Sequence, residues 1–435
     1  MASKTENVKW VDGLRGCASL LVVFTHIARA FDVDLFLPTS AEGAAPRILQ
    51  YPFFRVFTQG RIGVSIFALV TGYVCALKPI RQIRSGCPES AFNSISRSAF
   101  RRIPRLVLPT TIATTLIWLL CQLGVFDIAN HVQSVWLNHS SPNATPYVGP
   151  ALRDLVYNLI TTWTKEFNVY DINQWTLFPL LKGSMLVYVM IVASAYCKTR
   201  YRMIVEFSLF LFCYIAKDAT FGMLFFFGAF LSDLSQHPSH NHWLANHRLL
   251  SCVLSPLLIV FGMLLASYPE DKAEWAHWSE ILRQMAAYIF PADNETPRYY
   301  SGLGLIFICM GIHISNFVKD ALSHRWLLWL GKNSFAVYLL HGTLLRTILV
   351  WMYFGVSIPA DIIHEDGSSQ PGHLPYPGRL RWYFWMPIWF FILYSIANLW
   401  TKYVDPWCAK ATESLVRFVF QESTDDSVEK GLIPR

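Results

Sequence analysis

The stretch Trp10–Phe31, WVDGLRGCASLLVVFTHIARAF, decides the fold, because from Leu14 onward it is long and apolar enough to cross most of a bilayer. Ionisable side chains are costly in lipid, yet Arg15 stands at its start and His26 lies deep within it. Steps of about 100° per residue bring both side chains to one face of a helix, about 16 Å apart along its axis. The stretch therefore predicts a permanent cation near one membrane surface and a titratable imidazole near mid-membrane.

Two other interpretations of this stretch remain open. A buried His can simply hydrogen-bond between packed helices, and an Arg at a helix end can extend toward the headgroups. Lys4 and Lys9 before the apolar run, together with the small residues around Arg29, also resemble a cleaved signal peptide. Arg15 inside the run and the many apolar segments that follow favour an uncleaved first span.

Composition predicts an integral membrane protein, whose expected partner is the lipid bilayer. Of the 435 residues, 53% are hydrophobic and 15% are charged, and the mean hydropathy is +0.34. The net charge of +7 indicates topology bias and anion binding rather than nucleic-acid binding. The 9 Cys lie mostly in apolar stretches without paired spacing, which indicates neither a disulfide framework nor a zinc site.

The hydropathy pattern predicts an all-α, polytopic transmembrane helix bundle of about ten spans. We expect residues 1–9 to form a cytoplasmic N-terminus, 10–405 the transmembrane domain and 406–435 a cytoplasmic C-terminal tail. The expected spans are residues 14–31, 61–79, 105–124, 177–197, 203–216, 219–233, 250–267, 300–317, 334–354 and 382–404.

Basic residues set the expected orientation. Arg and Lys cluster between the second and third spans and after the fourth, and cytoplasmic loops are enriched in these residues. Both loops lie on the side of the N-terminus, so we expect both termini to be cytoplasmic. Asn138 and Asn143 begin glycosylation sequons on the opposite side, and Asn294 begins a third that Pro297 makes less favourable. These features predict a glycoprotein of the endoplasmic reticulum or another secretory-pathway membrane.

Two groups of polar residues stand outside the spans. Arg101, Arg102 and Arg105 lie where a cytoplasmic loop enters the third span; topology bias explains them as well as function does, but clustered guanidinium groups also suit phosphates. Four His occur in residues 236–247, which read as a solvated loop without a metal-ligand spacing. We therefore predict no metal site.

Two motifs resemble those of a known family. Residues 12–16, DGLRG, followed by an apolar run and His26, resemble the opening signature of the acyltransferase 3 family of membrane proteins. Residues 330–342, LGKNSFAVYLLHG, are similar to its late motif, which ends on Tyr338 and His341. The resemblance covers about residues 8 to 405 and has a fungal character.

The resemblance implies site residues near each end of the bundle. Arg102 and Arg105 match an RxxR element linked to the phosphates of an acyl donor, with Arg101 beside them. Arg15 would anchor a donor phosphate or polarise the thioester. We expect Arg15 and His26 to face one shared cavity.

The catalytic roles follow from the same resemblance. His26 would be the general base that deprotonates a hydroxyl, while His341 and Tyr338 would position the acceptor or shuttle a proton. An acyl-His26 intermediate remains an open alternative. In the fourth span Leu180 stands where relatives usually carry Glu, which leaves altered substrate choice or reduced activity open.

The sequence thus predicts a membrane O-acyltransferase. It would transfer an acyl group, expected to be acetyl, from cytosolic acyl-CoA to a hydroxyl of a small molecule, lipid or sugar, with secondary metabolism the favoured setting and no metal required. A transporter or flippase would also need buried ionisable residues. A catalytically inactive membrane partner is the third possibility, which Leu180 keeps open. The sequence does not indicate an oligomeric state.

Overall fold

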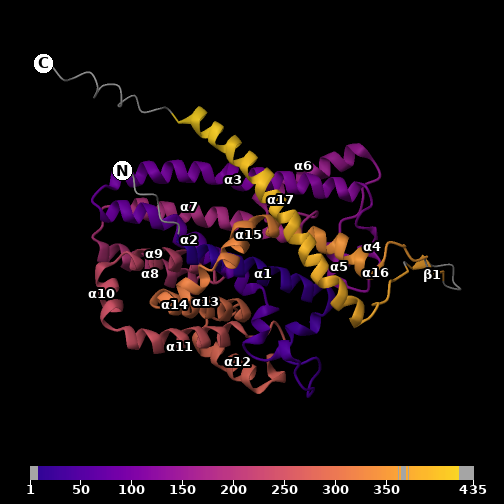
Figure 1. The fold of residues 1–435 in the computed structure, drawn as a ribbon, viewed down its shortest axis with the longest axis horizontal. Helices are drawn as coiled ribbons and strands as arrows, with labels where there is room; N and C mark the ends of the chain where they lie inside the picture. The colour runs from indigo at the N-terminus through magenta and orange to yellow at the C-terminus, as the bar shows by residue number, and fades with distance from the viewer. Residues whose placement is uncertain (1–7, 361, 364–368, 371, 421–435) are drawn as a thin grey trace.

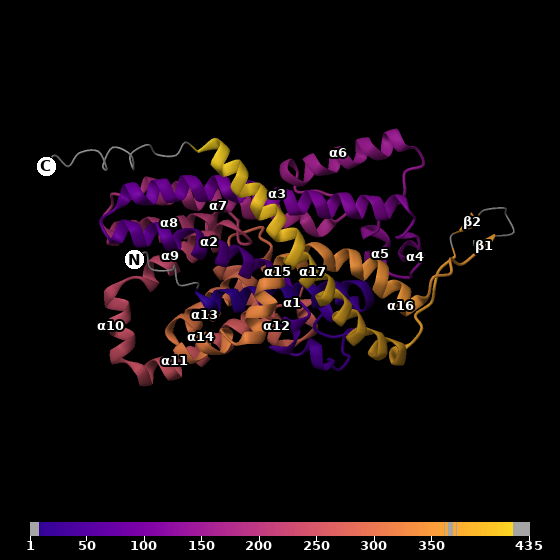
Figure 2. The ribbon, with the colours of Figure 1, turned by 45° about the horizontal axis from the view of Figure 1, so that its top comes forward.

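The computed structural model describes residues 8–360, 362–363, 369–370 and 372–420, and Figures 1 and 2 draw the others in grey. Most of the predicted N-terminal segment 1–9 and the end of the predicted tail therefore lie outside the described residues. In the described part of the chain the fold is helical apart from one pair of two-residue strands. The predicted all-α class is confirmed.

The helices and strands have the following bounds. The α-helices are α1 (Lys9–Phe31), α2 (Arg61–Arg84), α3 (Pro88–Gln122), α4 (Asp127–Asn130), α5 (Val135–Ser140), α6 (Val148–Thr164), α7 (Leu177–Ala193), α8 (Thr199–Ile215), α9 (Gly222–Ser235), α10 (Pro238–Asn246), α11 (Arg248–Ala266), α12 (His277–Ile289), α13 (Thr296–Ile314), α14 (Asn316–Leu322), α15 (Arg325–Leu344), α16 (Val350–Phe354) and α17 (Arg379–Val419). The shorter elements are η1 (Val33–Phe36), η2 (Ile48–Gln50), η3 (Phe54–Phe57), η4 (Ile172–Thr176), η5 (Ala273–Trp275), the π-helical η6 (Leu345–Leu349), β1 (Ile362–Ile363) and β2 (Ser369–Gln370).

The number of spans differs from the prediction. Every segment predicted to span forms a helix, but within the described residues 7 helices are long and apolar enough to cross a membrane. An eighth span requires joining α13 to α14, which meet at a bend of 106°. Helices α8 and α9 have 17 and 14 residues, so they are about 25 Å and 21 Å long and fall short of a hydrocarbon core of about 30 Å. The prediction of about ten spans is therefore not confirmed.

The predicted loop at residues 236–247 also differs, because α10 occupies most of it. Pro238 stands at the start of this helix, where the missing N–H of proline leaves no helical hydrogen bond unmade. The prediction of an irregular loop throughout this segment is wrong.

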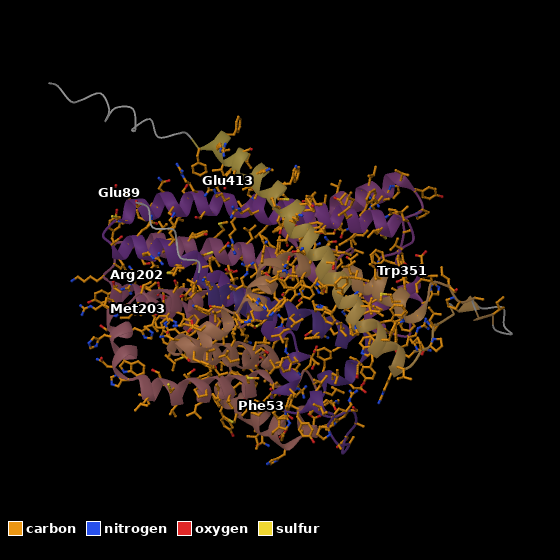
Figure 3. All side chains as sticks on the ribbon, viewed as in Figure 1. Phe53, Glu89, Arg202, Met203, Trp351 and Glu413 are labelled. Atoms are coloured by element: carbon orange, nitrogen blue, oxygen red, sulfur yellow. The ribbon has the colours of Figure 1, made fainter. Side chains whose placement is uncertain are left out.

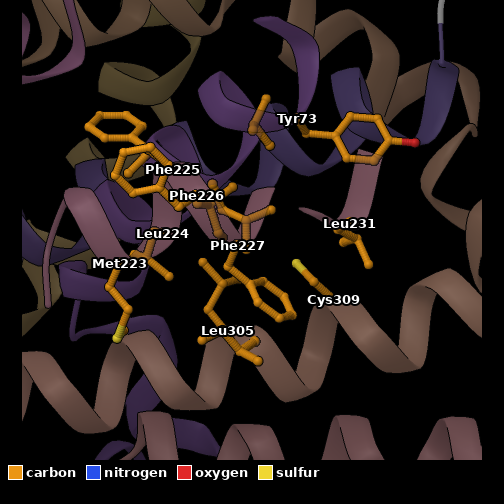
Figure 4. Packing of buried hydrophobic residues seen from close by; sticks show 14 of the residues in the cluster. Tyr73, Met223, Leu224, Phe225, Phe226, Phe227, Leu231, Leu305 and Cys309 are labelled. Atoms are coloured by element: carbon orange, nitrogen blue, oxygen red, sulfur yellow. The ribbon is translucent and has the colours of Figure 1, made fainter. Parts of the chain in front are cut away.

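Helix α9 lies at the centre of the larger hydrophobic core. Its three consecutive phenylalanines, Phe225–Phe227, are buried, and Figure 4 shows them between Tyr73 of α2 and Leu305 of α13. A Cβ atom on Gly72 would overlap the backbone of Phe225. Small residues let membrane helices approach to backbone contact, which explains how a short helix is enclosed here.

Helices α1 and α15 pack through glycines in the same way. A Cβ on Gly331 would overlap the carbonyl group of Asp12, and a Cβ on Gly16 would lie 2.6 Å from the carbonyl oxygen of Leu327. The two backbones therefore touch near the N-terminal ends of both helices. This contact sets the height of every later residue of α15 relative to α1.

The last helix, α17, is longer than a membrane is thick. Its 41 residues extend about 60 Å, against a hydrocarbon core of about 30 Å. Figures 1 and 2 show it crossing α3 and continuing past the bundle. The predicted boundary between residues 405 and 406 falls inside this helix, at a point where the helix continues without interruption.

Candidate active site

The two predicted histidines meet between α1 and α15. His341 Nε2 lies 3.2 Å from His26 Nδ1, and the ring centroids are 5.0 Å apart. His26 follows Gly16 by ten residues and His341 follows Gly331 by ten residues. Parallel helices that touch at these glycines rise about 15 Å over ten residues and so bring both imidazoles to one height. The two imidazoles therefore meet at one level of the helical bundle.

The backbone around the pair fixes which nitrogen of each ring carries a proton. His341 Nδ1 lies 2.9 Å from the carbonyl oxygens of both Val337 and Tyr338, and His26 Nδ1 lies 2.9 Å from that of Val22. Because a carbonyl only accepts, each Nδ1 must donate. Neutral His341 then presents an unprotonated Nε2, so the single Nδ1–H of His26 is shared between this nitrogen and the carbonyl oxygen of Val22. The remaining nitrogen, His26 Nε2, keeps its lone pair and is the basic atom of the pair.

His26 lines a cavity of about 500 Å³, which we call the histidine cavity. Its inner wall is apolar at Val22 and Val64, and Trp175 covers another side. Charged residues surround the rest, and most pair with one another: Glu270 accepts two hydrogen bonds from Arg29 at 3.0 and 2.8 Å. The histidine cavity therefore combines an apolar interior, a self-satisfied polar rim and one basic nitrogen.

A second cavity of about 490 Å³, which we call the arginine cavity, collects the predicted anion-binding residues. Arg15, Arg101, Arg102 and Arg105 all line it, although they come from α1 and α3. The predicted grouping of these four guanidinium groups is confirmed. Arg15 lies 3.6 Å from Asp12, one helical turn away.

Tyr338 lines the arginine cavity rather than the histidine cavity. Its hydroxyl donates to the carbonyl oxygen of Asn173 and lies 2.7 Å from the hydroxyl oxygen of Thr176. Its ring centroid is 6.2 Å from that of His341, which lies three residues farther along α15. Leu180 is also part of the arginine cavity, and the described residues that line it include no Asp or Glu.

The prediction that Arg15 and His26 face one shared cavity is wrong. Arg15 lines the arginine cavity and His26 the histidine cavity. The two cavities back onto each other, since Trp175 lines the histidine cavity and the next residue, Thr176, lines the arginine cavity. The helical face was correctly predicted, but other helices close the space between its two polar groups. Arg15 and His26 therefore lie on opposite sides of the side chains that separate the two cavities.

Sequence reasoning missed a buried charged pair just beyond the histidines. Arg346 lies in the π-helical turn η6 and is 1% exposed. It donates to the carbonyl oxygens of Gly342, Ser140 and Tyr170, and the carboxylate of Asp171 contributes an attractive charge. A π-helical turn is frequent at functional sites. The sequence signal was a lone Arg five residues after His341 in an apolar span.

Burial raises the pKa of the Asp171 carboxyl to about 6, against the opposing charge of Arg346. Asp171 is 1% exposed and caps η4 by accepting from the backbone N–H of Asn173. The folded protein takes up a proton here near pH 6, whereas the unfolded chain does so near pH 4. The stability contributed by this uptake is complete below about pH 4 and is lost as the pH rises through about 6.

We therefore expect the free energy of unfolding of the native protein, relative to that of Asp171→Asn, to rise by on the order of 2–3 kcal/mol between pH 7.5 and pH 4.5. Thermal unfolding of both purified proteins in detergent at the two pH values measures this difference. An unchanged difference would show that Asp171 has an ordinary pKa.

The described residues contain no group of three or more His, Cys, Asp or Glu arranged to hold a metal ion. His240 of α10 stacks on the buried His313 with ring centroids 4.7 Å apart, but neither residue lines either of the two cavities. The candidate active site is therefore the histidine pair together with the two cavities beside it.

Comparison with known proteins shows which family the chain resembles. Residues 8–404 match the acyltransferase 3 family model, which is described as an acyltransferase domain. The O-acetyltransferase PaAT-1 of Phomopsis amygdali is 25% identical, over 79% of this chain and 73% of that protein. Acyltransferase R4 of a Phoma species is 22% identical, over 76% of this chain and 81% of that protein. No solved structure matches the chain.

The family match covers nearly all of the described helical bundle, from α1 into α17. It includes both motifs that bring His26 and His341 together and the arginines of the second cavity. The chain therefore belongs to the acyltransferase 3 family.

Proposed function

We propose that this protein is a membrane O-acyltransferase that transfers an acyl group, acetyl in the first instance, from acyl-CoA to a hydroxyl of a small-molecule, lipid or sugar acceptor. One observation carries the proposal: a histidine pair borders a mainly apolar cavity through His26, and this cavity backs onto a second one that is lined by four arginines. The family and the O-acetyltransferase relative support it.

The arginine cavity is the proposed donor site. Guanidinium groups bind phosphates through paired, charged hydrogen bonds, and CoA carries three phosphates on a long flexible arm. Arg102 is the strongest phosphate ligand in this proposal, because its contact within the cavity is a single 3.4 Å hydrogen bond to the Thr71 hydroxyl. The pantetheine arm then extends inward along Leu180 toward Tyr338.

The histidine cavity is the proposed acceptor site. The acceptor hydroxyl donates its proton to His26 Nε2, and its oxygen attacks the thioester carbonyl carbon. The new O-acyl bond forms as the C–S bond breaks, and the CoA thiolate takes up the proton from His26. His341 lines neither cavity, so we assign it as a positioning residue that holds His26 in the correct tautomer. The side-chain layer between the cavities must open during transfer.

The proposed topology follows the positive residues. The arginine cavity would face the cytosol, where acyl-CoA is available, with both termini on that side. Asn138 and Asn143 are exposed and would then face the lumen of a secretory-pathway membrane, in which glycans are added. Asn294 is less suited to a glycan, because its side-chain nitrogen, the atom that carries a glycan, donates a 2.7 Å hydrogen bond to the carbonyl oxygen of Pro291 and the residue borders the histidine cavity.

Radiolabelled acetyl-CoA supplied to membranes that contain the protein should label an acceptor. We expect Arg102→Ala to raise the KM for acetyl-CoA by about tenfold or more, because a charged hydrogen bond contributes about 1.5–3 kcal/mol, while kcat changes little. Arg153→Ala is the matched control, since Arg153 of α6 has a side chain that is 80% exposed.

The outcomes separate the candidate functions. Movement of an unmodified solute without acetylation would indicate a transporter, and absence of both acetyl-CoA binding and labelling would indicate an inactive partner. Equal KM values for the two variants would remove the arginine cavity from the donor site.

A further inference from the structure

The C-terminal half of α17 contacts two of the arginines that line the arginine cavity. Glu413 lies 2.9 Å from Arg101 and 3.9 Å from Arg105, measured from carboxylate oxygen to guanidinium nitrogen. Both arginines line the arginine cavity. Figure 3 labels Glu413 where α17 passes over α3. A carboxylate more than 300 residues farther along the chain therefore contacts one arginine of the predicted RxxR element, Arg105, and the neighbouring Arg101.

Packing holds this part of α17 in place. Thr412 and Val416, on either side of Glu413 along the helix, are buried. At the end of the helix, the rings of Phe420 and Phe100 meet edge to face with centroids 5.5 Å apart, and the Arg97 guanidinium lies 5.9 Å from the Phe420 centroid. Glu413 is consequently presented to the arginines by a docked helix, which distinguishes it from a freely moving surface carboxylate.

The ion pairs of Glu413 are strong enough to form and weak enough to be replaced. The side chains of Glu413 and Arg101 are 33% and 37% exposed, and ion pairs at such partly exposed sites contribute little to stability. A phosphate group offers more negative charge and more acceptor oxygens to the same guanidinium groups. A carboxylate in this position therefore competes with a phosphate-bearing ligand and loses to one at sufficient concentration.

We propose that Glu413 is a residue of the donor site that competes with the phosphates of acyl-CoA for Arg101 and Arg105. The inference rests on the proposed function, because it takes the arginine cavity as the CoA site. Glu413 lowers the affinity for acyl-CoA and for the product CoA alike, since both carry the same phosphates. It returns to Arg101 and Arg105 as CoA leaves, which limits inhibition by product.

Direct binding of acetyl-CoA tests this without a known acceptor. Titration of the purified full-length protein in detergent should give a Kd for acetyl-CoA about two- to fivefold lower for Glu413→Gln than for the native protein, matching the loss of a weak competing ion pair. CoA should show the same change. Glu89→Gln is the matched control. Glu89 is exposed at the N-terminal end of α3, where Figure 3 labels it.

A double-mutant cycle shows whether the effect passes through Arg101. In an Arg101→Ala background, Glu413→Gln should change the Kd for acetyl-CoA less than it does in the native background. A higher Kd in Glu413→Gln would mean that Glu413 orients the arginines, and an unchanged Kd would mean that it has no part in the site; either result overturns the inference. A native protein that does not bind acetyl-CoA overturns the donor assignment itself.

Discussion

Replacing His26 with alanine is expected to lower the rate of acyl transfer by about 10²–10⁴-fold, the usual contribution of a general base. His26 Nε2 is the basic nitrogen that the hydrogen bonds of the pair leave free, and His26 is the histidine that lines the acceptor-side cavity. The loss should appear in kcat, with little change in the Kd for acetyl-CoA, because the arginine cavity is untouched. Acetyl transfer and acetyl-CoA binding by the purified variant measure the two quantities.

His313→Ala is the matched control for the loss of a buried imidazole. His313 of α13 is 4% exposed and lines neither cavity. We expect this variant to keep its activity while its thermal stability falls. Activity retained by a folded His26→Ala protein would refute the assigned base, and equal loss in both variants would attribute the effect to packing.

Gly331→Ala is expected to reduce activity by more than tenfold at a site about 15 Å from the chemistry. Its new Cβ would overlap the carbonyl group of Asp12, so α15 must move away from α1. Overpacking of this kind costs typically about 1–3 kcal/mol. Because His341 lies ten residues farther along the displaced helix, its 3.2 Å contact with His26 should lengthen and the proton arrangement of the pair should be lost.

Gly149→Ala in α6 provides the opposite case. A Cβ at Gly149 would meet nothing within 4 Å, and alanine favours a helix over glycine by about 1 kcal/mol. This variant should be as active as the native protein and at least as stable. Acetyl transfer and thermal unfolding of both variants make the comparison, and an unimpaired Gly331→Ala protein would show that the α1–α15 contact does not set the histidine geometry.

Several site residues could be predicted because their signals are local. Arg15 and His26 fall on one face of one helix, and an ionisable residue in an apolar run stands out from its neighbours. His341 carried a similar signal, and Arg102 stood out as part of a basic cluster that matches a family element. Arg346 was visible in the same way but was not interpreted, because its partners are backbone carbonyls of Ser140 and Tyr170 that no sequence pattern marks.

The number of membrane spans could not be predicted as accurately as these site residues. Hydropathy detects apolar segments, but a helix that is wrapped by protein is as apolar as one that faces lipid. α9 shows this: it has 14 residues, and nearly all of its side chains are buried by neighbouring helices. Length and surroundings together decide whether such a helix spans.

The sequence by itself determined the membrane environment, the helical fold, the family motifs and the side chains available for chemistry, because hydropathy and helical periodicity act over a few turns of chain. Tertiary structure alone decided that Arg15 and His26 face different cavities, that His26 Nδ1 meets His341 Nε2, and that Glu413 reaches Arg101. These features depend on where helices cross, and a crossing is set by contacts such as Gly331 against Asp12, between residues far apart in the chain. One helix face carried both groups, but the helices packed against it decided which space each group meets.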